Sequence, residues 1–169
     1  MSRPHRHVEL WRRVPASDRR AWSGLLRVYR CIVPRLDGEL EREHRLSLSA
    51  YDVLVQVSSA DSGLRMGQLA DEVLLSPSGL TRLVDRLVDA GLVERRRGET
   101  DVRQTYVSIT EQGLDLVADA TATHLRAVHA LFLDRLDPDE KRILAKAFTR
   151  ILEADGDRRA PARKTRVST

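Results

Sequence analysis

Apolar residues recur every three or four positions along most of the chain, a spacing typical of helices with one buried face. The first such stretch spans residues 18–43. Pro34 lies inside it and predicts a kink or a break, because proline removes one backbone hydrogen bond of a helix. A second helix is expected to begin near Ser47 or Ser49, since either serine can act as its N-cap.

Two shorter helices are expected to meet across a tight turn. The first has an apolar stripe from Met66 to Leu74. Ser76 and Pro77 mark the start of the second, because a serine oxygen caps free amides and proline's fixed φ suits the first helical position. Gly91 favours the left-handed conformation that ends a helix. The inner face of the second helix is predicted to consist of Leu80, Leu83, Val84, Leu87 and Val88.

A β-hairpin is predicted immediately after these two helices. Residues 92–96 and 105–109 have the composition of strands, and the second alternates apolar with polar side chains. Residues 97–101 form the tip of this hairpin. A helix, turn, helix and hairpin in this order make up a winged helix-turn-helix, so the predicted fold class is mainly α (α+β).

Two long helices complete the pattern. Thr110 can cap the first, which runs to about residue 134, and the sequence DPDE from Asp137 is a strong start signal for the second. Their apolar faces exceed what a winged lobe can cover, so we expect a second subunit to bury the rest. The dimer interface is assigned mainly to Val14, Trp22, Leu25 and the stretch from Leu131 to Leu152.

The predicted organisation is a single domain over residues 17–154. A winged lobe at about 47–113 lies between dimerisation helices at about 17–44 and 110–154. Residues 1–16 are expected to be a flexible basic arm with at most one extra amphipathic turn, and 155–169 a disordered basic tail.

The positive charge of the chain is concentrated at its ends. The formal net charge is +4, but residues 1–17 and 155–169 each carry +3, which leaves 18–154 at −2. Any nucleic-acid binding by the folded part therefore depends on where individual cations lie, and not on bulk attraction.

Several classes of protein are excluded by the pattern. No apolar run approaches the roughly 20 residues that span a bilayer, and no secretory signal is visible, so we expect a cytoplasmic protein without membrane contact. Cys31 is the only cysteine, which excludes an internal disulfide. The five histidines form no metal motif and no nucleophile lies beside a base, so we predict no metal, no cofactor and no enzyme activity.

Residues 66–113 resemble the DNA-binding lobe of the MarR (multiple antibiotic resistance regulator) family of transcription factors. The resemblance is carried by the pair LA, then TRLVDRL, GLVERR, an Asp101-x-Arg103 motif and ITEQG, in that order and spacing. It implies a dimeric, sequence-specific regulator of transcription that binds a pseudo-palindromic operator in double-stranded DNA. It also implies a repressor whose DNA binding is relieved by a small aromatic or anionic effector.

The DNA-binding residues follow from the outward face of the second short helix and from the wing. The resemblance implies that the helix enters the major groove and the arginine-rich hairpin the minor groove, while Asp101 pins the hairpin by pairing with Arg103 or a nearby arginine. The predicted DNA-binding residues are Ser76, Ser78, Gly79, Thr81, Arg82, Arg86, Arg95, Arg97 and Arg103.

Alternatives stay open for several of these residues. Arg82 can bind a guanine, clamp a phosphate, or pair with Asp85 or Asp89 as an ordinary surface charge. The wing arginines can equally form a solvated basic turn. At the level of function, the alternative is a winged helix that serves protein assembly without specific DNA binding.

An effector pocket and a redox site are the remaining hypotheses. Cys31 is either inert packing or an oxidant sensor with arginines nearby in the sequence, in which case the protein is a one-cysteine redox-sensing regulator. Aromatic residues at helical spacing are either core residues or the lining of an effector site. The candidates for that site are Trp22, Tyr29, His44 and Tyr51.

Overall fold

The computed structural model describes residues 6–60, 62–73, 75–97 and 104–156. The predictions for Leu74, the hairpin tip, Asp101, Arg103 and the tail from 157 lie outside these residues. Along the described chain the elements are α1 (Arg6–Arg13), α2 (Ala16–His44), α3 (Leu48–Ser58), β1 (Leu64–Arg65), α4 (Met66–Glu72), α5 (Pro77–Asp89), β2 (Val93–Arg97), β3 (Thr105–Ile109), α6 (Glu111–Leu131), the short 3₁₀ helix η1 (Leu133–Arg135) and α7 (Pro138–Gly156).

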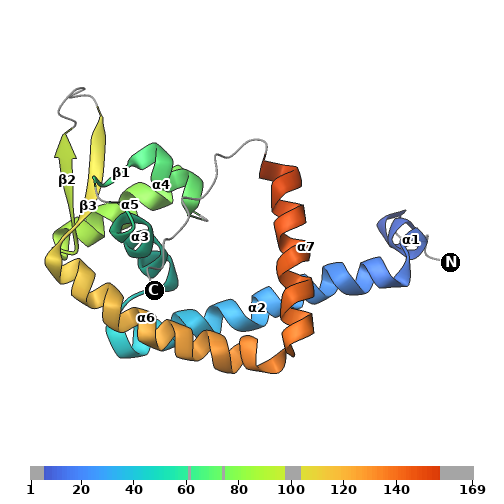
Figure 1. Cartoon of the computed structure of the whole chain (residues 1–169). Coiled ribbons are helices and arrows are strands. Elements are labelled where there is room, and N and C mark those ends of the chain that lie inside the picture. Colours follow the sequence, from blue (N-terminus) through green and yellow to red (C-terminus); the bar gives the residue numbers. More distant parts are fainter. Residues whose placement is uncertain (1–5, 61, 74, 98–103, 157–169) are drawn as a thin grey trace.

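The elements form a compact lobe at one end of a helical stem (Figure 1). The lobe contains α3, α4, α5 and a three-stranded antiparallel sheet in the order β1-β3-β2. Helices α2 and α6 pack along each other in opposite directions and make the stem, and α7 stands away from the lobe at its far end. The mainly α winged helix-turn-helix fold predicted from the pattern is therefore confirmed.

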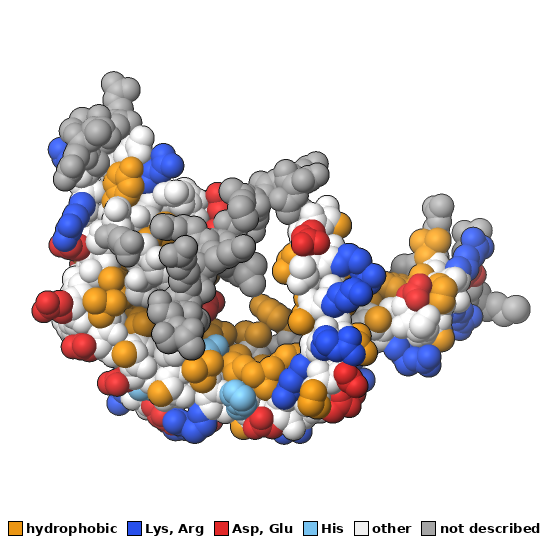
Figure 2. All heavy atoms as spheres, in the orientation of Figure 1, with side chains coloured by type: hydrophobic (Ala, Val, Ile, Leu, Met, Phe, Trp, Pro, Cys, Tyr) orange, Lys and Arg blue, Asp and Glu red, His pale blue; other side chains and the backbone are white. Residues whose placement is uncertain are grey.

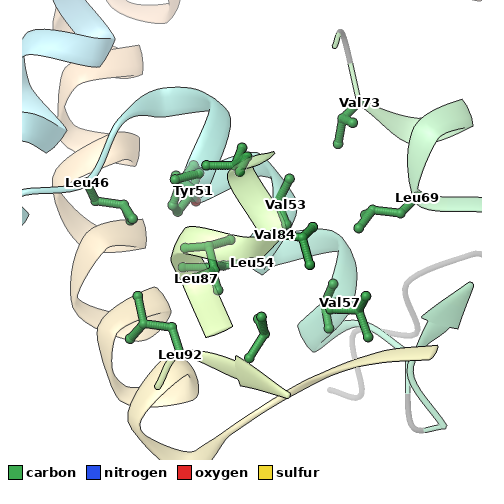
Figure 3. Close-up of a cluster of buried hydrophobic side chains, with 14 of the residues drawn as sticks. Leu46, Tyr51, Val53, Leu54, Val57, Leu69, Val73, Val84, Leu87 and Leu92 are labelled. Carbon is green, nitrogen blue, oxygen red and sulfur yellow. The ribbon is translucent and has the colours of Figure 1, made fainter. Parts of the chain in front are cut away.

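The hydrophobic core lies inside the lobe (Figure 3). Helix α5 contributes its predicted stripe, in which Leu80, Leu83, Val84 and Leu87 are buried and Val88 is half-buried. Burial of each such side chain contributes about 1.5–3 kcal/mol, which is why α5 can present only its opposite side to solvent. The largest fully buried side chains are Leu40, Leu54, Leu69, Leu80, Val53, Val57, Val84, Val93 and Val107.

Short-range hydrogen bonds set the helix starts. The Ala50 N–H donates to Ser47 Oγ at 3.2 Å, so Ser47 and not Ser49 caps α3. Thr110 caps α6 in the same way, through the Gly113 N–H at 3.0 Å. Gly91 has a φ of +71° immediately after α5, as its predicted role in ending the helix requires.

Pro34 does not break the first long helix. Helix α2 runs without interruption from Ala16 to His44, so of the predicted kink or break, the break is wrong. Pro34 and Arg30, whose carbonyl loses its helical partner, are both exposed. Water can satisfy that carbonyl, and the buried Leu36 and Leu40 hold the helix against the lobe on the other side of the proline.

The amino-terminal segment differs from the flexible arm that was predicted, because its described part forms the helix α1. The Arg19 guanidinium of α2 donates to the Val14 carbonyl at 2.6 Å and to the Trp11 carbonyl at 3.2 Å. The first bond satisfies the Val14 carbonyl just beyond α1, and the second adds to the Val14 N–H that the Trp11 carbonyl already accepts. The helix is thus stabilised by a side chain that lies beyond the segment itself.

The remaining differences are small. Helix α6 ends at Leu131, a little before the predicted residue 134, and α7 continues to Gly156, into the segment predicted as disordered. Strand β1 was not predicted, since two residues are too few to show alternation; it exists because Leu64 and Arg65 pair with β3. No helix in the described ranges has both the length and the hydropathy needed to cross a bilayer.

Candidate nucleic-acid interface

The side of α5 opposite the core carries a group of polar side chains. Ser76, Ser78, Thr81, Arg82 and Arg86 are exposed, and Gly79 between them is half-buried. The structure therefore brings six of the predicted DNA-binding residues together on one helix face, at the surface of the lobe. Their contact with DNA stays a prediction.

The first turn of this face is held by its own hydroxyl groups. The Gly79 N–H donates to Ser76 Oγ at 3.2 Å, which makes Ser76 the N-cap of α5. A Cβ atom added to Gly79 would lie 3.1 Å from that oxygen, so glycine leaves the cap room to close. The Thr81 hydroxyl donates to the Pro77 carbonyl at 3.0 Å, and its oxygen can still accept a bond from a base or a water.

Arg82 and Arg86 are the cations of this face. The Nε–H of Arg82 donates to the Ser78 carbonyl at 3.3 Å, and the other N–H donors of the guanidinium remain available. Within the described ranges neither arginine forms an ion pair with a carboxylate. The alternative interpretation, in which Asp85 and Asp89 neutralise them, is not what the structure shows.

Asp85 pairs with the wing instead. Its Oδ1 lies 2.5 Å from Nη1 of Arg95, so an arginine predicted to bind DNA is attached to α5. Arg96, the next residue on β2, pairs with Glu94. Arg97 is exposed at the end of β2, opposite Thr105. Sequence reasoning missed the Asp85–Arg95 contact because no helix or strand repeat relates two residues on different elements.

A second polar cluster fastens the base of the wing. Arg65 of β1 donates to Gln68 Oε1 at 3.2 Å and to Gln104 Oε1 at 3.3 Å. The Tyr106 hydroxyl donates to the same Gln104 oxygen at 3.2 Å. Arg65 was not among the predicted site residues, and its short strand offered no pattern that could have identified it.

The four residues proposed for an effector pocket do not come together within one chain. His44 Nε2 lies 2.8 Å from Thr123 Oγ1, and the buried Tyr51 hydroxyl lies 3.1 Å from Thr121 Oγ1, so both contact α6. Trp22 instead lines a groove of about 440 Å³ with Trp11 of α1, and Tyr29 is exposed on α2.

The junction between stem and lobe contains groups with shifted pKa values. Hydrogen bonds from Thr123 and Arg126 lower the pKa of Glu43 to about 2. Burial lowers the pKa of His124, whose Nδ1 is buried without a hydrogen-bond partner among the described residues. Partial desolvation by the surrounding protein raises the pKa of Asp52, although the residue as a whole is exposed. The His124 ring centroid lies 4.8 Å from that of Tyr51.

Two further observations concern Cys31 and possible metal ligands. Cys31 is exposed on α2, so in a single chain it is not a packing residue. Within the part of the chain that the structure describes, no three histidine, cysteine or acidic side chains gather closely enough to hold a metal ion.

Large apolar side chains remain exposed on the stem and on α7. Trp22 and Leu25 of α2 and Ile143, Ile151 and Leu152 of α7 are each 46–67% exposed. Figure 2 shows hydrophobic side chains gathered over the stem between the lobe and α7. These residues belong to the set assigned to a dimer interface, and no described element of a single chain buries them.

Comparisons with known proteins point to one family. The profile of the MarR family matches residues 46–104. A helix-turn-helix transcriptional regulator of Mycobacterium leprae is 32% identical over 111 residues, which are 64% of this chain and 74% of that protein. AbsC, a MarR family regulator from Streptomyces coelicolor, has a TM-score of 0.77 and 29% identity over 86% of this chain and 98% of its own.

A second regulator from Streptomyces coelicolor, Sco3205, was solved in complex with DNA. It has a TM-score of 0.77 and 25% identity, and the match covers 83% of this chain and 92% of that one. The matched proteins are transcriptional regulators and not enzymes, in agreement with the prediction made from the sequence.

Proposed function

Because the chain belongs to the MarR family of transcriptional regulators, we propose that it is a homodimeric repressor that binds a pseudo-palindromic operator and is released from it by a small molecule. Two copies of the lobe address two half-sites, with α5 of each copy in the major groove. The matched regulator Sco3205 was crystallised with DNA, which supports double-stranded DNA as the partner.

The observation that carries this proposal is the exposed polar face of α5. Its N-terminal turn presents Ser78 and Thr81, and Arg82 follows with most of its donors unspent. Hydroxyl and guanidinium groups at the start of a recognition helix are the groups that bind base edges and flanking phosphates. If α5 served only protein assembly, its polar face would have to bind another protein in place of DNA. No observation favours such a protein partner.

Dimerisation is supported by the apolar side chains exposed on α2 and α7. Ile143, Ile151 and Leu152 are 60–67% exposed, on a helix that stands away from the lobe (Figure 1). A monomer rarely leaves so many large apolar groups in water, whereas a two-fold symmetric partner can bury them. The dimer then sets the recognition helices about one turn of the duplex apart, roughly 34–36 Å.

The wing supplies contacts outside the major groove. Arg97 lies exposed at the end of β2, and we assign it, with Arg103, to the minor groove, while Asp101 pins the tip of the hairpin. Arg95 has a different task in this proposal. Its ion pair with Asp85 positions β2 against α5, so that the two DNA-contacting parts keep a constant relative orientation.

Effector relief is assigned to the junction between lobe and stem, near His44 and Tyr51. A small aromatic or anionic molecule that binds there shifts the dimer from one spacing of its lobes to another. The shift is only as large as the difference between the molecule's affinities for the two spacings. The His124 nitrogen that lacks a partner among the described residues adds a hydrogen-bonding group beside Tyr51. Trp22 and Tyr29 lie elsewhere on the chain and are not needed for this site.

Selection of bound duplexes from a random pool, followed by salt titration, tests the proposal. The expected result is a two-fold symmetric site bound at least 10³ times more tightly than random DNA, with a steep salt dependence for both. A screen for small molecules that release the selected duplex then tests effector relief. Binding without any preferred site would contradict a specific regulator and favour the assembly module.

A further inference from the structure

A cleft of about 400 Å³ opens between α5 and the beginning of α3. Two serines, Ser47 and Ser49, line it from α3, and Gly79, Arg82 and Arg86 line it from α5, with two leucines completing the wall. The sequence pattern placed Ser47 and Ser49 only as candidates for the helix cap. The cleft gives them a common polar surface with the two arginines.

The charge of this cleft is positive and uncompensated within the described residues. One of the five N–H donors of Arg82 bonds to the Ser78 carbonyl, and Arg86 has no ion-pair partner among the described residues. Asp85, which lies between them in the sequence, is neutralised by Arg95 on the wing. Two guanidinium groups therefore line one cleft without a carboxylate, an arrangement that attracts an anion.

The serine hydroxyls add neutral donors to the same cleft. Ser47 Oγ already accepts the Ala50 N–H at 3.2 Å, so its own proton is left to donate. The Ser49 hydroxyl forms no hydrogen bond with any described residue and is half-buried. Hydroxyl and guanidinium donors around a space of this size match the several acceptor oxygens of a phosphate group.

We propose that this cleft binds one backbone phosphate of the DNA, and that Ser49 is a DNA-contacting residue contributed by α3. The proposal rests on the proposed function. Gly79 and Arg82 belong both to the cleft and to the face of α5 that enters the groove, so an anion in the cleft lies beside the bases that α5 faces. Phosphates border the major groove along its whole length, which makes a DNA phosphate the anion that meets this position in the complex.

Two substitutions of Ser49 test the contact without threatening the fold. Ser49 is the second residue of α3, where alanine is a good helix former and an acidic residue is favoured by the helix dipole. Ser49→Ala removes one hydrogen bond, and Ser49→Glu places a negative charge in the cleft. The control is Ala122→Glu, which adds the same charge at an exposed position of α6 in the stem.

The expected effects differ between the variants. Ser49→Ala weakens binding by about fivefold on the selected operator and on random duplex alike, because a phosphate contact carries no sequence information. Ser49→Glu weakens binding to the operator and to random duplex by on the order of 100-fold. It also makes the negative slope of log K against log salt less steep by about one. Ala122→Glu changes neither affinity by more than about twofold.

A scan with methylphosphonate linkages identifies the phosphate directly. A neutral linkage at one position of each half-site weakens the wild-type protein, and the same linkage produces no further loss in the Ser49→Ala, Arg86→Ala double variant. Inorganic phosphate and benzoate are titrated in parallel against the complex. Release of DNA by either anion at millimolar concentration, dependent on Ser49 but with no single DNA phosphate coupled to it, would overturn the proposal in favour of a free-anion site.

The outcome is also separable from that of the proposed function. If the Ser49→Glu variant binds DNA as tightly as the wild type does, the proposed phosphate contact is wrong, while the proposal of a specific regulator still stands. Wild-type protein that binds all duplexes equally sinks the specific regulator, yet the Ser49 variants are still decisive, because the phosphate contact is measured on random duplex as well.

Discussion

The Asp85 carboxylate of α5 lies 2.5 Å from the Arg95 guanidinium of β2, so α5 and the wing are joined by an ion pair between their polar surfaces. Both side chains are partly exposed, at 48% and 34%. Water therefore weakens the pair, and its contribution to the free energy of unfolding is on the order of 0.5 kcal/mol. Its main effect is on orientation, since it couples the two elements that we propose to face the DNA.

Arg95→Ala is expected to weaken operator binding severalfold while leaving the salt slope of binding unchanged, because Arg95 positions the wing and does not neutralise a phosphate. Asp85→Asn should have a similar effect, and the double variant should be no worse than either single one. Fluorescence anisotropy at several salt concentrations measures both quantities. A slope that falls by about one in Arg95→Ala would instead make Arg95 a phosphate contact.

Gly113→Ala is expected to destabilise the lobe by about 3 kcal/mol. A Cβ at this position would lie 2.1 Å from the Leu92 carbonyl oxygen, a backbone atom that can move only if the entry to the wing moves with it. Gly38→Ala is the matched control, because a Cβ there meets nothing within 4 Å, and it should stabilise α2 by about 0.5–1 kcal/mol. Urea denaturation of both variants measures the difference, and equal midpoints would contradict the close contact.

Glu43→Gln is expected to destabilise the protein at neutral pH and to lose this effect in acid. The pKa of Glu43 is lowered from 4.5 to about 2 by hydrogen bonds from Thr123 and Arg126. A carboxylate with a lowered pKa stabilises the fold fully above its unfolded value, and the contribution disappears as the pH falls from about 5 towards 2. Denaturation of the wild type and the variant across this range measures it; a constant difference at all pH values would contradict the shift.

Ile151→Glu is expected to convert the dimer to a monomer, because it places a charge on an apolar side chain that is 61% exposed in the single chain and buried in the proposed interface. Loss of the second lobe should weaken operator binding by on the order of 100-fold. The neighbouring exposed residue supplies the control, since Arg150→Glu changes the charge of the same helix by more. Sedimentation velocity decides the outcome, and a wild type that is itself monomeric would contradict the dimer.

Local signals in the sequence accounted for helices α2 to α7 and for the exposed face of α5. Ser76 and Thr110 were identified as caps, and Ser47 as one of two candidates with Ser49, because a cap bonds to an amide three residues away, within reach of a sequence pattern. The stripe from Leu80 to Leu87 determined which side of α5 is buried and so which polar residues face out. These relationships depend on periodicity and hold wherever the helix happens to pack.

Contacts between distant elements were decided only by the tertiary structure. Asp85 and Arg95 meet because β2 turns back beside α5, and the donors that hold α1 come from Arg19 on the next helix. His44 and Tyr51 are held by α6, about 70 to 80 residues further along, through Thr123 and Thr121, whereas Trp22 lines a groove with Trp11 of α1. The sequence by itself determined helices α2 to α7, the two strands of the wing and the buried face of α5, since these follow from interactions within one or two helical turns, whereas α1 and β1 were not predicted. The tertiary structure alone decided which polar groups form hydrogen bonds or ion pairs with each other and which remain unpaired. These pairings depend on how segments distant in the sequence pack together, which no local repeat encodes.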